Sequence, residues 1–148
     1  IQSHRVLMSV EAAADHEERL ALHPADYLPK IRGLLEEGLR TSAACYVRAK
    51  QHQQLLGREI LACFENADVL LTPATPGPAP DTSTTGDPKF NSPWSFTGLP
   101  TVSFPVGLAP DGLPLAIQLV GRSFAEVELF RCAFWCEQRL YSGQFTCL

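Results

Sequence analysis

Residues 91–107 (NSPWSFTGLPTVSFPVG) contain three serines that could act as nucleophiles: Ser92, Ser95 and Ser103. A hydrolase activates such a serine with a base at hydrogen-bond distance and with donors for the oxyanion. A nucleophile elbow has glycine two residues before and two residues after the serine, and neither PWSFT nor TVSFP has this pattern. The nearest histidine in the sequence is His52, and no S-x-x-K spacing occurs. We therefore do not expect a catalytic serine here, although Ser95 and Ser103 remain the candidates for a self-contained hydrolase.

Cysteines and histidines offer no better chemistry. The five cysteines are Cys45, Cys63, Cys132, Cys136 and Cys147, and the four histidines are His4, His16, His23 and His52. An odd, scattered set of cysteines favours reduced thiols over a disulfide framework. Cys132 and Cys136 have helical i, i+4 spacing, but no histidine stands at a matching distance for a metal site. With no glycine-rich phosphate loop either, the sequence predicts no metal and no cofactor.

Composition limits the class of protein. The chain has 148 residues, 45% of them hydrophobic, and a net charge of −4, which suits one globular domain. Without a cluster of Lys and Arg we expect no nucleic-acid partner, and without a long apolar run we expect no membrane span. No signal peptide is visible, so we expect a cytoplasmic protein. Because the chain starts at Ile1 and its only methionine is Met8, we expect that further sequence precedes it.

The first part of the chain is typical of helices. Their apolar spacing predicts helices over residues 10–22, 29–40 and 42–66. Thr41 or Ser42 is the expected N-cap of the third helix.

From Asp68 onward, the spacing of apolar residues is no longer typical of helices. We expect a buried strand over residues 68–73, a proline-rich loop over 73–88, and two strands over 101–107 and 114–121 joined as a hairpin. Pro105 indicates that the first strand of the hairpin is an edge strand or is bulged. Ser123 and Glu126 match a capping box, which predicts a helix from there to Leu140 that must pack on a sheet or on another helix.

Four blocks, in this order and spacing, resemble the C-terminal part of the amidase signature family, the amide-bond hydrolases that include the glutamyl-tRNA amidotransferase A subunit. The blocks are YLPKIRGLLEEGLRTSAACYVRAKQHQQLLGREILACFENA, ADVLLTPATPGPAP, FNSPWSFTGLPTVSFPVG and DGLPLAIQLVGRSFAEVELFRCAFWCE. The resemblance implies an α/β fold in which helices flank a mixed β-sheet. Residues 1–148 would be the C-terminal portion of a single amidase domain, helical over 1–67 and built of strand, loop, hairpin and helix over 68–148.

The resemblance also implies a reaction, namely hydrolysis of a small-molecule carboxamide through a serine acyl-enzyme. The Ser-Ser-Lys set of the family lies in a Gly/Ser-rich core, and no such run occurs here, so we expect the chain alone to be inactive. By resemblance, Phe90, Asn91 and Trp94 would lie on the substrate side, while core packing of the two aromatic rings is the alternative. We expect Gln118 to hold a sheet edge or a loop by a hydrogen bond. Pro88 stands where a glutamine-specific enzyme would have a charged residue, which favours a general amidase.

Two hypotheses on partners follow. As a segment of an amidase, the chain would pack against the N-terminal half of the same fold and expose apolar surface without it, so that copies of the chain could self-associate. Alternatively, the chain is a non-catalytic binding or assembly module that retains only this half.

Overall fold

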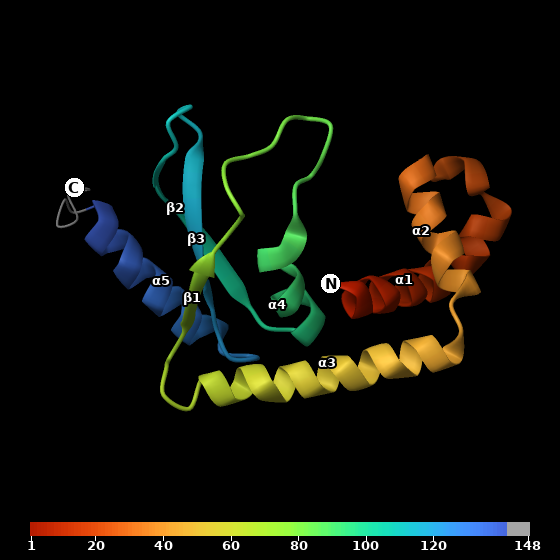
Figure 1. Cartoon of the computed structure of the whole chain (residues 1–148), viewed down its shortest axis with the longest axis horizontal. Coiled ribbons are helices and arrows are strands. Elements are labelled where there is room, and N and C mark those ends of the chain that lie inside the picture. The colour runs from red at the N-terminus through yellow and green to blue at the C-terminus, as the bar shows by residue number, and fades with distance from the viewer. Residues whose placement is uncertain (142–148) are drawn as a thin grey trace. The chain divides into compact units, whose positions relative to one another are not determined.

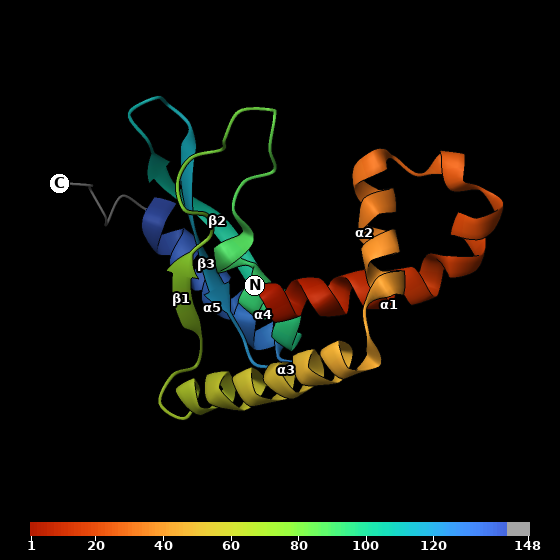
Figure 2. The ribbon, with the colours of Figure 1, turned by 45° about the vertical axis from the view of Figure 1, so that its right-hand side comes forward.

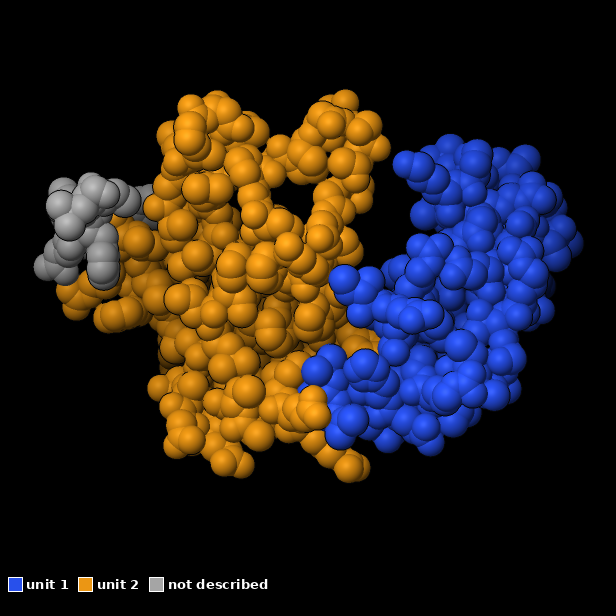
Figure 3. Space-filling view, in the orientation of Figure 1, with its two compact units in different colours: residues 1–57 blue, residues 58–148 orange. Residues whose placement is uncertain are grey.

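The structure, a computed structural model, describes residues 1–141. Cys147 lies outside the described residues. The chain divides into two units, residues 1–57 and 58–148 (Figure 3).

Helices make up the first unit. They are α1 (Gln2–Leu22), the 3₁₀ helix η1 (Pro24–Asp26), α2 (Pro29–Arg40) and most of α3 (Ala43–Cys63). The expected helix over 10–22 is the second half of α1, and the expected helix over 29–40 is confirmed as α2. The N-cap of α3 is confirmed as well, because the Ser42 hydroxyl oxygen accepts a hydrogen bond from the Cys45 N–H at 3.3 Å.

Helices α1 and α2 approach each other closely at Gly38. A Cβ atom added at Gly38 would lie 2.0 Å from the Ser9 carbonyl oxygen and 2.7 Å from the Ala13 Cβ. Ser9 and Ala13 are both buried at this contact, and Leu35 on the same helix as Gly38 is 1% exposed. The absence of a side chain at Gly38 is therefore what allows these two helix backbones to pack.

The second unit contains a three-stranded sheet in the order β1-β3-β2 (Figure 1). Its strands are β1 (Leu70–Pro73), β2 (Thr101–Leu108) and β3 (Pro114–Val120), and both pairings are antiparallel. The hairpin of β2 and β3 is confirmed. Both alternatives for Pro105 hold, since β2 is an edge strand of this sheet and its register shifts between Pro105 and Gly107.

The expectation of a buried strand over residues 68–73 was wrong. β1 lies at the other edge of the sheet, and its residues alternate between half-buried and exposed, with Leu71 63% exposed. A short apolar run does not distinguish a central strand from an edge strand that is apolar on both faces.

Helix α5 (Glu126–Tyr141) packs on one face of the sheet, as expected for an apolar helix (Figure 2). The buried side chains at this contact are Phe104, Leu119, Leu129 and Ala133. The helix begins at Glu126, so the expected capping box at Ser123 was wrong. A turn with Phe124 at a φ of 60° separates Ser123 from the helix, and the first helical bond of α5 runs from the Leu129 N–H to the Ala125 carbonyl.

Arg122, two residues after β3, holds the segment that follows α3. Its guanidinium donates hydrogen bonds to the carbonyls of Phe64 and Ala67 and lies 5.4 Å from the centre of the Phe64 ring. Arg122 thus satisfies carbonyls just beyond the end of α3, where the helix leaves them without partners. None of the helices in residues 1–141 is both long and apolar enough to cross a bilayer.

Candidate functional site

Two short helices follow the proline-rich loop. The 3₁₀ helix η2 (Pro88–Phe90) begins after Asp87, whose carboxylate accepts a hydrogen bond from the Lys89 N–H at 3.0 Å. The six-residue helix α4 (Ser92–Thr97) then ends at Gly98, which has a φ of 71°. Helix α4 was not expected from the sequence, and it occupies the segment with Ser92 and Ser95.

Gln118 connects these elements to the sheet. It lies on the central strand β3 and is 2% exposed. Its side-chain amide donates two hydrogen bonds, to the Phe90 carbonyl at 2.6 Å and to the Pro73 carbonyl at 3.2 Å. Since Leu119 packs against α5, the alternation of a strand places Gln118 on the opposite face. The expectation that Gln118 holds a loop by a hydrogen bond is confirmed.

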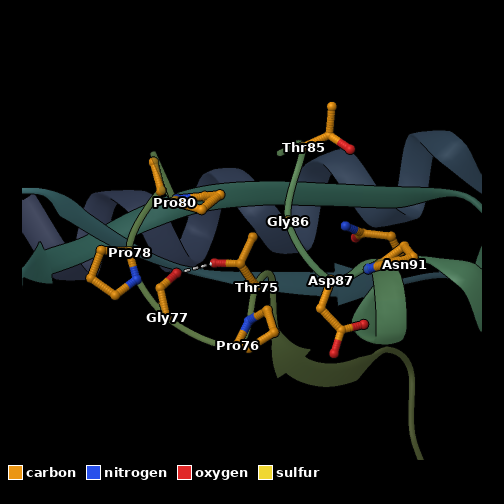
Figure 4. Close-up of a pocket in the computed structure, with 11 residues that line it drawn as sticks. Thr75, Pro76, Gly77, Pro78, Pro80, Thr85, Gly86, Asp87 and Asn91 are labelled. Carbon is orange, nitrogen blue, oxygen red and sulfur yellow. Dashed lines mark hydrogen bonds between the residues drawn. The ribbon is translucent and has the colours of Figure 1, made fainter. Parts of the chain in front are cut away.

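Between the two carbonyls that Gln118 holds, residues 74–89 form a loop with a hollow of about 330 Å³. Figure 4 shows Pro76, Gly77, Pro78 and Pro80 on one side of this hollow and Thr85, Gly86, Asp87 and Asn91 on the other. The residues that line it are Thr75, Pro76, Gly77, Pro78, Ala79, Pro80, Thr85, Gly86, Asp87, Pro88 and Asn91. We call this space the loop hollow.

Prolines and short local hydrogen bonds shape the loop. The Thr75 hydroxyl donates to the Gly77 carbonyl at 2.6 Å, and the Thr84 hydroxyl oxygen accepts from the Gly86 N–H at 3.1 Å. Hydrogen bonds from Ser83 also hold the pKa of the Asp81 carboxyl below its ordinary value. Fixed φ angles at proline and side-chain-to-backbone bonds define such a loop without a ladder of backbone bonds.

The three residues expected on the substrate side lie at different places. Asn91 lines the loop hollow. Phe90 does not line it; its carbonyl is held by Gln118, and Lys89 Nζ lies 5.4 Å from the centre of its ring. Trp94 lies one turn further along α4, and its Nε1 is buried without a hydrogen-bond partner among the described residues.

The chemistry available in the loop hollow is polar recognition. Thr75, Thr85, Asp87 and Asn91 are the polar and charged residues on its lining. These groups can donate hydrogen bonds to a small polar molecule and accept them from it. The sequence predicted a proline-rich loop here, but it did not point to Thr75, Thr85 or Asp87.

The described part of the second unit contains no histidine that could serve as the base of a serine nucleophile. All four histidines of the sequence precede residue 58 and belong to the first unit. Ser92 is buried in α4, whereas Ser95 and Ser103 are exposed. The arrangement within residues 58–141 therefore lacks the imidazole that a serine nucleophile most often uses.

Cys132 and Cys136 are half-buried against the core under α5. Burial raises the pKa of the Cys136 thiol, and the nearby Cys132 raises it further. A raised pKa leaves less of the reactive thiolate at neutral pH. Across residues 1–141, no three His, Cys, Asp or Glu side chains gather as a metal site would require.

Curated relatives and solved structures match this chain over part of their own length. The A subunit of the glutamyl-tRNA(Gln) amidotransferase of Bartonella tribocorum is 40% identical over 106 residues, which are 64% of this chain and 22% of the relative. Its counterpart from Rhodospirillum rubrum is 43% identical over 91 residues, 56% of this chain and 18% of the relative. The chain thus spans about a fifth of the length of the curated relatives it matches.

Among solved structures, an amidase shares 28% identity with a TM-score of 0.83, over 93% of this chain and 35% of its own. A protein described with the evolutionary origins of an s-triazine catabolic enzyme shares 25% identity with a TM-score of 0.80, over 96% of this chain and 34% of its own. These matches confirm the expected α/β class and the amidase-type fold. The family model described as Amidase matches residues 24–130, and the chain belongs to the amidase signature family.

Proposed function

We propose that this chain is the substrate-side portion of an amidase-type hydrolase that cleaves the C–N bond of a small carboxamide through a serine acyl-enzyme. The observation that carries the proposal is the loop hollow, a space lined mostly by prolines and glycines together with Asp87 and Asn91. Gln118 holds it on the sheet, within a chain that the Amidase model matches over residues 24–130. The Ser-Ser-Lys set would then be supplied by sequence outside these 148 residues. The solved structures support this, because the chain matches only 35% of the amidase and 34% of the protein described with the s-triazine enzyme.

Asn91 and Trp94 are the side chains that we assign to substrate. The Asn91 amide can donate to the carbonyl and accept from the NH₂ of a carboxamide, which is the pairing that two amides make with each other. A buried N–H without a partner, such as Trp94 Nε1, is costly in a folded protein, by about 1–3 kcal/mol. Trp94 does not line the loop hollow, so an acceptor for its Nε1 would have to reach it from outside that space.

The rest of the amidase fold is the partner that we propose. Phe130 and Phe134 are 62% and 63% exposed on α5. Together with Val102 and Phe104 they line a hollow of about 350 Å³ beside the edge strand β2. Exposed aromatic side chains gathered at a hollow mark a surface that another part of a protein covers.

The exposed aromatic pair predicts dye binding by the isolated chain. Replacing both residues (Phe130→Gln with Phe134→Gln) should lower the fluorescence of a bound hydrophobic dye about twofold, because the apolar lining is lost. Phe124→Gln is the matched control, since Phe124 is 96% exposed and does not line that hollow. An equal loss of fluorescence in both proteins would contradict the assignment of this surface.

The reading frame upstream of Ile1 tests the proposed function directly. We expect it to encode a Gly/Ser-rich run with the nucleophilic serines and a lysine. The full product should release ammonia from benzamide or propionamide faster than from glutamine, whereas the 148-residue chain should release none. An upstream frame without such a core, or a folded full product that hydrolyses no amide, would favour the non-catalytic module instead.

In the same product, Asn91→Leu tests the substrate side. Loss of one hydrogen bond should raise KM roughly 2–10-fold. Asn66→Leu provides the control, because Asn66 is exposed and does not line the loop hollow. An unchanged KM with Asn91→Leu would remove this residue from the site.

A further inference from the structure

Gln118 makes both of its described hydrogen bonds to backbone that is remote in sequence. The Phe90 carbonyl precedes it by 28 residues and the Pro73 carbonyl by 45 residues. One of these carbonyls stands at the end of β1, before the loop hollow, and the other stands at the end of η2, after it. A single side-chain nitrogen thus closes the loop at its base.

Few other contacts hold this base. Ala74 donates its N–H to the Ala116 carbonyl at 3.0 Å, which continues the pairing of β1 by one residue. From Thr75 to Asp87 the residues are mostly exposed, and the side-chain hydrogen bonds described for this loop join groups two residues apart. The end of the loop at Phe90 is joined to the sheet by the 2.6 Å bond from Gln118.

We propose that Gln118 is a positioning residue that sets the closed form of the loop hollow and thereby the place of Asn91. Gln118 does not line the loop hollow itself, so it acts through the backbone that it holds. Its role toward substrate rests on the proposed function, whereas its effect on the loop does not. An apolar residue of similar volume would fill the same space but would leave two carbonyls without a donor.

Replacing the side-chain NH₂ of Gln118 by an oxygen distinguishes a positioning role from mere filling of the core. In Gln118→Glu the ionised carboxylate is acceptor-only and faces two carbonyl oxygens, so the loop should open. Burial raises the pKa of a carboxyl, and once protonated the new side chain regains one O–H donor. The loop should therefore close again as the pH falls, in a variant whose shape is unchanged.

Hydrogen exchange, corrected for the intrinsic rate at each pH, measures this in the 148-residue chain. We expect Gln118→Glu to lower protection of residues 74–91 about tenfold at pH 8 and to regain most of it at pH 5, while Gln118→Met stays low at both. The charged residues of the loop, Asp81, Asp87 and Lys89, are also present in the wild type, so the wild type should show no such change in protection between the two pH values. Leu119→Met is the matched control, because Leu119 is equally buried on the same strand but faces α5.

Each outcome decides the proposal. Protection of residues 74–91 in Gln118→Met equal to that in the wild type would overturn it. A loss that is spread equally over β2, β3 and α5 would show that Gln118 only fills the core and would also overturn it. None of these measurements requires amide hydrolysis, so failure of the proposed function would leave them unaffected.

Discussion

Gly38→Ala should destabilise the first unit by about 2 kcal/mol. A methyl group there would meet the Ser9 carbonyl oxygen at 2.0 Å and the Ala13 Cβ at 2.7 Å, so α1 and α2 must move apart. Overpacking of this kind costs about 3 kcal/mol at the upper end of its usual range. The better helix propensity of alanine returns only about 1 kcal/mol, so the steric clash decides the sign.

Gly33→Ala on the same helix is the matched control. A Cβ at Gly33 meets nothing within 4 Å, so only the gain in helix propensity remains, and this variant should be more stable by about 0.5–1 kcal/mol. Hydrogen exchange in α1 and α2 under mild urea measures both changes. Equal shifts in the two variants would contradict the close approach of the helices.

Long elements with strong boundary residues could be predicted from the sequence. The helix over residues 29–40 was predicted at its observed bounds, where Pro29 is at the first helical position and Arg40 is in the last turn. The hairpin was predicted because two β-rich segments flank a short turn with Pro110 and Gly112. In both cases the information is local, since turn and helix-end chemistry depends on residues close in the chain.

Short elements and helix starts could not be predicted in the same way. Helix α4 has six residues, which is too few for a helical period to show. Its C-terminal end is marked by Thr97, whose hydroxyl donates to the Pro93 carbonyl at 2.7 Å, and by the left-handed Gly98. The start of α5 was misplaced because the pattern at Ser123 and Glu126 ignores the left-handed turn at Phe124.

In the candidate site, too, local features could be predicted from the sequence and contacts between remote segments could not. That Gln118 would hold a loop followed from a polar residue within a strand pattern. Its two partners could not be named, because the Phe90 and Pro73 carbonyls reach it only through the strand register and the path of the loop. The unpartnered Trp94 Nε1 likewise depends on burial, which no spacing of residues shows.

The contact between α5 and the sheet yields the largest expected loss of stability. Leu129 is 1% exposed and packs with Phe104 and Leu119. Leu129→Ala should therefore lower the free energy of unfolding by about 2–5 kcal/mol, the usual effect of a cavity in a core. The midpoint of urea unfolding measures it through the tryptophan fluorescence, since Trp94 and Trp135 both belong to the second unit.

The contact between Gly121 and Leu129 provides a second test of how α5 packs on the sheet. A Cβ at Gly121 would lie 3.2 Å from the Leu129 Cβ and 3.4 Å from its Cδ2, so Gly121→Ala alone should cost about 1 kcal/mol by crowding. In the double variant, the 3.2 Å contact with the Cβ of residue 129 remains, but the contacts with Cδ2 at 3.4 Å and Cγ at 3.5 Å are relieved. The double loss should fall short of the sum by about 0.5–3 kcal/mol. Gly77→Ala, which meets nothing within 4 Å, should instead add to Leu129→Ala independently, and additivity in both pairs would refute the contact.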